Sequence, residues 1–263
     1  VVKWNNDKIR SVINMKALIT GASSGIGRDI AYLLSKRGYD LIIASRNTKN
    51  MEQVQKKLDT HVEIVTVDLS NIEDCYKLYH TVKEQDIDIV INNAGFGAFG
   101  NFWDIPLQKE LNMIDLNIKA VHILTKLFVN YFRKKNKGYI MNVASSAAFL
   151  PGPLMATYYA TKAYVLRMTE AIYKELQKEN SNVKISVLCP GPVDTAFNKR
   201  ANVSFSLKGM NSKDVSKYAI NKMFEGKMII IPGIVMKIAY IGEKFLPEKI
   251  LLNCAYHFQS KKG

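Results

Sequence analysis

The chain has 263 residues, 48% hydrophobic and 23% charged, which is enough to bury a sizeable core and excludes a largely disordered protein. Its three cysteines are far apart and its four histidines show no metal-binding spacing, so neither a disulfide framework nor a metal site is expected. The net charge of +14 comes without aromatic interleaving or nucleic-acid motifs, which argues for a solvated basic surface and against a nucleic-acid partner.

The first 14 residues lack the apolar core of a signal peptide, and Met15 stands directly before the first predicted strand. We therefore interpret residues 1–14 as an upstream extension without catalytic importance and Met15 as the natural start. No run of 18 apolar residues occurs, so no membrane-spanning helix is predicted. These features predict a cytoplasmic protein.

Short apolar runs alternate with segments of helical periodicity, and the runs are typical of strands buried on both faces. The predicted strands are Ala17–Thr20, Leu41–Ala44, Ile64–Val67, Ile87–Ile91, Tyr139–Val143 and Val183–Leu188. The predicted helices are residues 25–37, 48–58, 71–85, 104–135 and 156–178. This alternation predicts an α/β fold in which a single doubly wound, Rossmann-type parallel sheet carries helices on both faces. Since no linker interrupts the pattern, we expect one domain over residues 15–263.

A glycine-rich turn joins the first predicted strand to the first helix, with the spacing G-x-x-x-G-x-G. Gly21 would allow a sharp turn, Gly25 would let a pyrophosphate approach the backbone, and Gly27 would let the helix pack close to the sheet. Taken without their context, three glycines in a turn indicate no more than a tight loop. Their position before a helix, whose free N–H groups attract phosphate, favours dinucleotide binding.

Further motifs follow in a fixed order. They are Asn92-Asn93-Ala94-Gly95, Asn117, Ser145 thirteen residues before Tyr158, Tyr158-x-x-x-Lys162, and Pro190-Gly191-Pro192-Val193-Asp194-Thr195. With the glycine turn, they resemble the short-chain dehydrogenase/reductase family from Gly21 to Thr195. The resemblance implies an oxidoreductase that transfers a hydride between a nicotinamide cofactor and a carbonyl or alcohol.

Tyr158 and Lys162 lie four residues apart on a predicted helix, so their side chains share one face. Tyr159 pairs at that spacing with the uncharged Ala163. A nearby cation favours the phenolate and lowers the pKa of a tyrosine. We therefore expect Tyr158, rather than its neighbour, to donate the proton.

The family resemblance implies the remaining roles. Lys162 would also hold the nicotinamide ribose, Ser145 would hydrogen-bond the substrate carbonyl, and Asn117 would hold a water that connects Lys162 to solvent. The residues expected to bind the cofactor are Gly21, Ser23, Ser24, Gly25, Ile26, Gly27, Arg46, Asp68, Leu69, Asn93, Ala94, Gly95, Tyr158, Lys162, Pro190, Gly191, Val193 and Thr195.

The end of the second predicted strand indicates which cofactor is used. NAD-preferring enzymes place a carboxylate there to bind the ribose 2′-hydroxyl, whereas this chain has Ser45 and Arg46. A guanidinium can form charge-assisted bonds to a 2′-phosphate, so NADP(H) is predicted. Asp68 matches the aspartate with which the family contacts adenine.

These features predict an NADPH-dependent reductase of a 3-oxoacyl thioester or another apolar ketone, with a homodimer or homotetramer as its assembly. Two alternatives stay open: an NADP-dependent alcohol or hydroxysteroid dehydrogenase working in the oxidative direction, and a non-catalytic NADP(H)-sensing protein. The chain is similar to bacterial 3-oxoacyl-carrier-protein reductases, but its C-terminus departs from theirs after Gly233.

Two loops and the C-terminal tail are the segments that could contact the substrate or a partner. Residues 96–108 and 196–212 flank the expected site, and their aromatic side chains could line a pocket or simply pack; the second loop is a candidate lid. Ile234–Phe245 and Glu248–Phe258 are predicted amphipathic helices, separated at Pro247. We interpret them as a lid or a subunit contact, with attachment to an anionic membrane surface as the alternative.

Overall fold

The computed structural model describes residues 15–201 and 209–262, so the prediction for residues 1–14 lies outside the described residues. The described chain contains a seven-stranded sheet in the order β3-β2-β1-β4-β5-β6-β7, in which every pairing is parallel. The strands are β1 (Lys16–Thr20), β2 (Asp40–Ser45), β3 (Val62–Thr66), β4 (Ile87–Asn92), β5 (Gly138–Val143), β6 (Val183–Leu188) and β7 (Ile229–Ile230). The predicted doubly wound α/β fold is confirmed.

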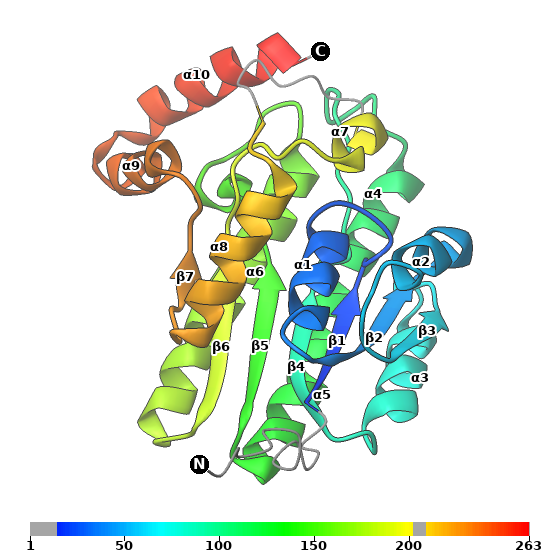
Figure 1. Cartoon of the computed structure of the whole chain (residues 1–263). Helices are drawn as coiled ribbons and strands as arrows, with labels where there is room; N and C mark the ends of the chain where they lie inside the picture. The colour runs from blue at the N-terminus through cyan, green and yellow to red at the C-terminus, as the bar shows by residue number, and fades with distance from the viewer. Residues whose placement is uncertain (1–14, 202–208, 263) are drawn as a thin grey trace, which may run out of the picture.

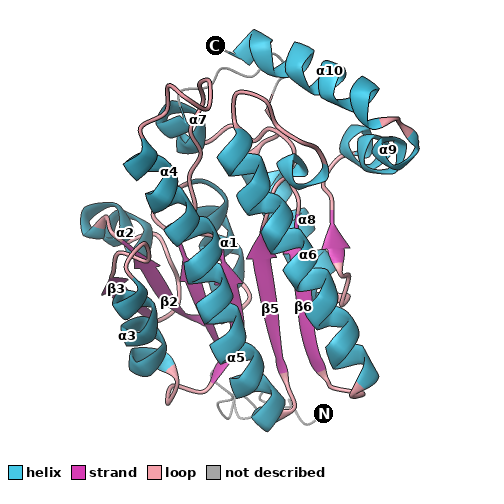
Figure 2. Ribbon diagram, turned by 180° about the vertical axis from the view of Figure 1, so that it is seen from behind, coloured by secondary structure: helices cyan, strands magenta, loops and turns pink. Residues whose placement is uncertain are grey.

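Helices cover both faces of the sheet (Figures 1 and 2). One face packs against α1 (Gly25–Ser35), α2 (Thr48–Gln55) and α8 (Ser212–Phe224). The other face packs against α3 (Ile72–Val82), α5 (Val121–Lys135) and α6 (Ala156–Lys178). Because β1 pairs with β2 on one side and β4 on the other, the strand order reverses at β1, and ligands of such sheets bind at the carboxyl ends there.

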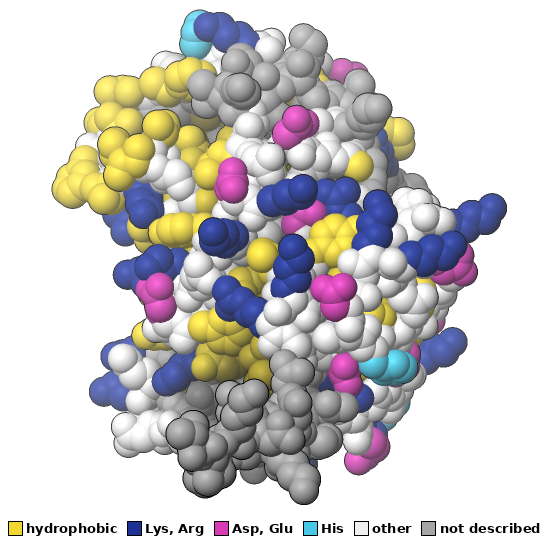
Figure 3. Space-filling model, viewed as in Figure 1, with side chains coloured by type: hydrophobic (Ala, Val, Ile, Leu, Met, Phe, Trp, Pro, Cys, Tyr) yellow, Lys and Arg dark blue, Asp and Glu magenta, His cyan; other side chains and the backbone are white. Residues whose placement is uncertain are grey.

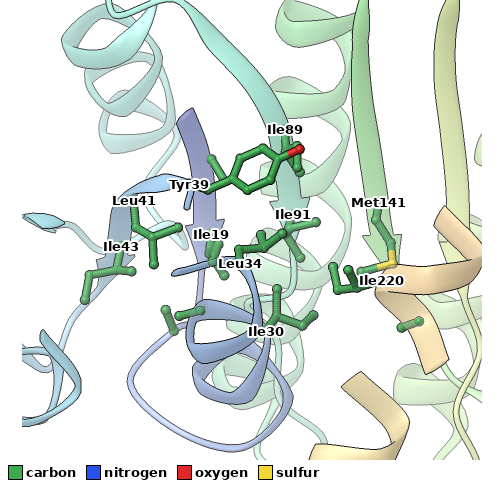
Figure 4. Packing of buried hydrophobic residues seen from close by; sticks show 14 of the residues in the cluster. Ile19, Ile30, Leu34, Tyr39, Leu41, Ile43, Ile89, Ile91, Met141 and Ile220 are labelled. Atoms are coloured by element: carbon green, nitrogen blue, oxygen red, sulfur yellow. The ribbon is translucent and has the colours of Figure 1, made fainter. Parts of the chain in front are cut away.

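The core follows from the alternation of side chains along each strand. Ile19 of β1 points to the α1 side, where it packs with Ile30 and Leu34, while its neighbour Leu18 belongs to the cluster on the opposite face. Figure 4 shows strand side chains meeting Ile30 and Leu34 of α1 and Ile220 of α8. Strands buried on both faces therefore need the nearly continuous apolar runs from which they were predicted.

The structure differs from the predictions in three places. The helix predicted over residues 104–135 begins later and is divided into α4 (Leu107–Ile114), a π-helical turn (Asp115–Ala120) and α5. Pro106 precedes α4, and a proline is suited to a helix start. Helix α8 and the short strand β7 were not predicted. The other predicted helix ends agree within three residues and the strand ends within two.

The chain beyond β7 forms the two helices expected on either side of Pro247, α9 (Ile234–Gly242) and α10 (Glu248–Gln259). Figure 1 shows both beyond the carboxyl ends of the strands, on the side of α8 and β7. A short helix, α7 (Ala196–Ala201), lies in the loop proposed as a lid; the part of that loop at 202–208 is outside the described residues. Across residues 15–201 and 209–262, none of the helices combines the length and apolar character needed to cross a membrane.

Candidate active site

The glycine turn follows β1 and ends at the N-terminus of α1. Gly21 and Gly25 have φ angles of +66° and +57°, a region that favours glycine. A Cβ on Gly27 would lie 2.4 Å from Asn93 Nδ2 and 2.6 Å from the Gly21 carbonyl oxygen, so that position also requires glycine. The turn is tied to the loop after β4, because Asn93 Nδ2 donates to the carbonyl oxygens of Thr20 and Gly21, 2.9 and 3.2 Å away.

This geometry fits the pyrophosphate of a dinucleotide. The glycines of the turn place no side chains between the backbone and the cavity, and the N-terminus of α1 borders the same cavity at Ser24 and Gly25. The α1 first turn carries no acidic residue that would repel phosphate. The role predicted for this turn is therefore compatible with its structure.

The end of β2 presents Arg46 beside Asp68, with Arg46 Nη1 3.5 Å from Asp68 Oδ2. Both side chains are largely exposed, at 62% and 44%, so this ion pair contributes little stability. Burial alone would raise the pKa of Asp68, but hydrogen bonds from Ser70 and the charge of Arg46 outweigh burial and lower it. Ser45 Oγ donates to Ser23 Oγ at 3.1 Å, which joins the end of β2 to the glycine turn.

Three of the four expected catalytic side chains meet at the carboxyl end of β5. Ser145 follows β5 and caps the short helix Ser146–Phe149, its Oγ accepting a hydrogen bond from Ala147 N at 3.1 Å. Tyr158, on the first turn of α6, lies beside the Ser145 hydroxyl, which acts to lower the pKa of the phenol. Lys162 lies one turn later, with Nζ 5.8 Å from the centre of the Tyr158 ring and 2.9 Å from the Val143 carbonyl oxygen to which it donates.

The pKa values of this group differ from the sequence-based expectation. Burial raises the pKa of Tyr158 well above its ordinary value, although the Ser145 hydroxyl acts in the opposite direction. Burial also lowers the pKa of Lys162 to about 8. The lowering of the tyrosine pKa that was expected from Lys162 is therefore not found, and desolvation determines the direction of the Tyr158 shift.

Asn117 lies in the π-helical turn between α4 and α5 and is completely buried. Its Nδ2 donates to the Phe96 carbonyl oxygen at 2.9 Å and to Thr161 Oγ1 at 3.1 Å, and its Oδ1 accepts from Phe96 N at 3.1 Å. Asn117 therefore joins the loop after β4 to the helix that carries Tyr158. Single π-helical turns are frequent at functional sites.

One cavity of about 460 Å³ extends from the glycine turn to the catalytic side chains. The predicted residues that line it are Gly21, Ser23, Ser24, Gly25, Ile26, Arg46, Asp68, Leu69, Asn93, Ala94, Gly95, Ser145, Tyr158, Lys162, Pro190, Gly191, Val193 and Thr195. Gly27 and Asn117 are outside this lining, the first packed behind the turn and the second held beneath the loop at Phe96.

The aromatic loops divide between the two roles considered for them. Phe96 and Phe197 line the cavity, and the Phe197 ring lies 5.4 Å from that of Tyr158. Phe99 packs in the apolar cluster beside the site, whereas Phe102 and Trp103 are 61% and 81% exposed. Phe205 and Leu207 of the second loop lie outside the described residues.

Sequence reasoning missed several residues of the site, among them Met155, Tyr159 and Gln259. Met155 and Tyr159 line the cavity, and Gln259 of α10 donates a hydrogen bond from Nε2 to the Tyr159 hydroxyl. Tyr159 directly follows the predicted donor, so its position was a usable signal. The contact with Gln259 joins residues 100 positions apart, and no local pattern indicates it.

Comparison with known proteins agrees with this geometry. Residues 15–204 match the family described as short chain dehydrogenase. An uncharacterised oxidoreductase of Staphylococcus epidermidis is 33% identical over 213 residues, which cover 78% of this chain and 90% of that protein.

Solved structures show the same fold. A short-chain dehydrogenase from Sphingobium yanoikuyae, in complex with NADPH, has a TM-score of 0.80 and 26% identity, covering 88% of this chain and 92% of that one. A short-chain dehydrogenase/reductase from Burkholderia phymatum, in complex with NAD, has a TM-score of 0.79 and 24% identity, covering 86% and 92%. The second likeness, at this identity, concerns the fold alone.

Proposed function

This chain belongs to the short-chain dehydrogenase family and is an oxidoreductase, and from that premise we propose that it is an NADPH-dependent reductase of an apolar ketone. The observation that carries this proposal is one cavity that joins two sets of groups. The glycine turn and Arg46 lie at one end of it, and Ser145, Tyr158 and Lys162 lie at the other.

The reaction needs a hydride for the carbonyl carbon and a proton for its oxygen. When bound, a reduced nicotinamide supplies the hydride. The Ser145 hydroxyl donates a hydrogen bond to the carbonyl oxygen and stabilises the negative charge that develops there. Tyr158 donates its proton to the same oxygen, which completes the alcohol. Lys162, fixed by the Val143 carbonyl oxygen, provides a positive charge near the tyrosine that has lost its proton.

We expect the rate of reduction to stay constant at acidic and neutral pH and to fall as pH rises above about 8. Lys162 loses its charge across that pKa, whereas the raised pKa of Tyr158 keeps the donor protonated. The measurement is kcat/KM for ketone reduction as a function of pH at saturating NADPH. A rate that increases over the same alkaline interval would contradict this assignment of the two groups.

The preference for NADPH rests on Arg46. Its guanidinium lines the cavity and its contact with Asp68 is exposed, so it can turn to a 2′-phosphate at little cost. No carboxylate lies at the end of β2, since Ser45 is its last residue and Arg46 follows it. The complex of the Sphingobium yanoikuyae relative with NADPH adds support.

Replacing Arg46 with aspartate is expected to lower the ratio of kcat/KM for NADPH to that for NADH by roughly 100-fold. The change removes a charge-assisted donor and puts a carboxylate against the phosphate. Arg37→Asp is the matched control, because Arg37 is an exposed arginine outside the cavity lining and undergoes the same change of charge. An unchanged ratio in Arg46→Asp would show that another part of the chain selects the cofactor.

The substrate class follows from the side chains beside Tyr158. Phe96, Met155 and Phe197 give that end of the cavity an apolar lining, which suits a ketone with apolar substituents. A 3-oxoacyl thioester is one such substrate and a steroid-like ketone is another. The same groups serve alcohol oxidation, so comparing kcat/KM in the two directions at physiological cofactor ratios tests whether reduction prevails.

A further inference from the structure

The outer side of the C-terminal segment carries a group of exposed apolar side chains. We call it the α9 patch, and it consists of Ile234, Val235, Ile238, Ile241 and Phe245. Each of these residues is 57–81% exposed, and α9, which the structure describes in full, has no buried residue. Figure 3 shows hydrophobic side chains gathered where Figure 1 places α9. A group of exposed apolar side chains of this kind is typical of a surface that binds a protein or a membrane.

The opposite side of α9 already has partners. Met236 packs next to Gly191, and the Tyr240 ring lies 4.6 Å from that of Phe149, while Lys237 Nζ lies 5.4 Å from the centre of the Tyr218 ring. These contacts hold α9 against the body of the protein. The α9 patch is therefore displayed outward on a fixed helix and is not an apolar face left over from an incomplete core.

Charged residues around the patch favour an anionic partner. Residues 233–261 contain four lysines against two glutamates. Lys244 and Lys249 follow the patch in the sequence, whereas Lys237 lies on the opposite side of α9, over the Tyr218 ring. Burial raises the pKa of one of these glutamates, Glu243, to about 7, although Arg167 and Lys244 act in the opposite direction. The negative charge of the segment is thus reduced further near neutral pH.

A second copy of the chain is a poorer occupant than a lipid surface. Two patches face to face would bring the same lysines together in chains that each carry a net charge of +14. An anionic bilayer offers the complementary charge and an apolar layer directly beneath it. A helix with an apolar stripe and flanking lysines is suited to lie in that interface.

We propose that the α9 patch attaches this protein peripherally to the surface of an anionic lipid bilayer. The patch residues enter the boundary between headgroups and acyl chains, and Lys244 and Lys249 face the lipid phosphates. The attachment places the bilayer at the same end of the molecule as the cavity, since Met236 of α9 packs on Gly191 of the cavity lining.

The test is sedimentation of the full chain with vesicles of phosphatidylcholine alone and with vesicles that also contain phosphatidylglycerol. We expect binding to the anionic vesicles and much weaker binding to the neutral ones. Ile234→Asp with Ile238→Asp should lower the partition coefficient at least about 100-fold. The matched control is Ile72→Asp with Tyr76→Asp on α3, which adds the same charge at the same four-residue spacing, at residues 40% and 41% exposed, and should bind as the unaltered chain does.

Two further measurements keep the outcome decisive. Thermal unfolding shows whether each variant is folded, and Lys244→Gln with Lys249→Gln, which leaves the apolar side chains intact, should weaken binding to anionic vesicles about 20-fold. The proposal is overturned if the unaltered chain binds neither vesicle, or if the α9 double variant binds as well as the α3 control. Light scattering tests the other occupant. If the unaltered chain is a dimer that does not bind vesicles, and the α9 double variant is a monomer, the patch binds a second copy instead.

Discussion

Replacing Tyr158 with phenylalanine is expected to lower kcat for ketone reduction roughly 1,000-fold while leaving NADPH binding almost unchanged. The variant lacks only the phenolic hydroxyl, which is the proposed proton donor. The ring would remain packed against Phe197, whose centre is 5.4 Å away, so the shape of the site is kept. Steady-state kinetics give the loss in kcat, and a fluorescence titration with NADPH gives the dissociation constant.

Tyr159→Phe is the matched control for this prediction. Tyr159 also lines the cavity, but its hydroxyl accepts a hydrogen bond from Gln259 and is not bonded to Ser145. Its loss is expected to cost stability of about 1–3 kcal/mol, because it leaves the buried Gln259 amide without that partner. The effect on kcat should be a few-fold at most. Equal losses of kcat in the two variants would remove the reason for assigning proton transfer to Tyr158.

Replacing Lys162 with methionine is expected to lower kcat/KM by roughly 1,000-fold and yet to raise the thermal unfolding midpoint. Lys162 is buried, and burial lowers its pKa from 10.5 to about 8, so its charge destabilises the fold by about 3 kcal/mol at neutral pH. The variant also loses the hydrogen bond to Val143, and this loss cancels about 1 kcal/mol of the gain in stability. The net gain in the free energy of unfolding is about 2 kcal/mol.

The pH dependence of stability tests whether the buried charge of Lys162 causes the gain in the Lys162→Met variant. The unfolded chain holds the Lys162 proton more tightly than the folded chain, so the penalty is complete below pH 8 and disappears as pH rises towards 10.5. The advantage of the variant should shrink across that window. Lys178→Met, at an exposed position on the same helix, should change neither activity nor stability appreciably. A lower unfolding midpoint for Lys162→Met would contradict this reading of the buried charge.

The sheet was predictable because its strands are buried on both faces. Such strands need nearly continuous apolar residues, as in the run around Ile42 and Ile43, and the helices between them keep one apolar side. Strand β7, of only two residues, is too short to leave a pattern. The π-helical turn at Asp115–Ala120 was not predictable either, since the residues around it keep ordinary helical periodicity and the extra residue per turn shows only in the hydrogen bonds.

The arrangement of the site was predictable where motifs sit at strand ends. Parallel strands bring their carboxyl ends to one edge, so Gly21 after β1, Asn93 after β4 and Ser145 after β5 had to be neighbours. The direction of the Tyr158 pKa shift was not predictable, because the pKa depends on how completely the hydroxyl is withdrawn from water. Neither was the contact between Tyr159 and Gln259, which depends on how the C-terminal helix packs.

The most direct test of the proposed reaction is NADPH oxidation by the full chain, measured with a panel of ketones. The panel contains acetoacetyl thioesters, steroid ketones and diketones, and alcohol formation is followed alongside loss of NADPH. We predict that at least one apolar ketone is reduced with one alcohol formed per NADPH consumed, and faster with NADPH than with NADH. Binding of NADPH without turnover of any ketone would contradict a reductase and favour a cofactor-sensing protein.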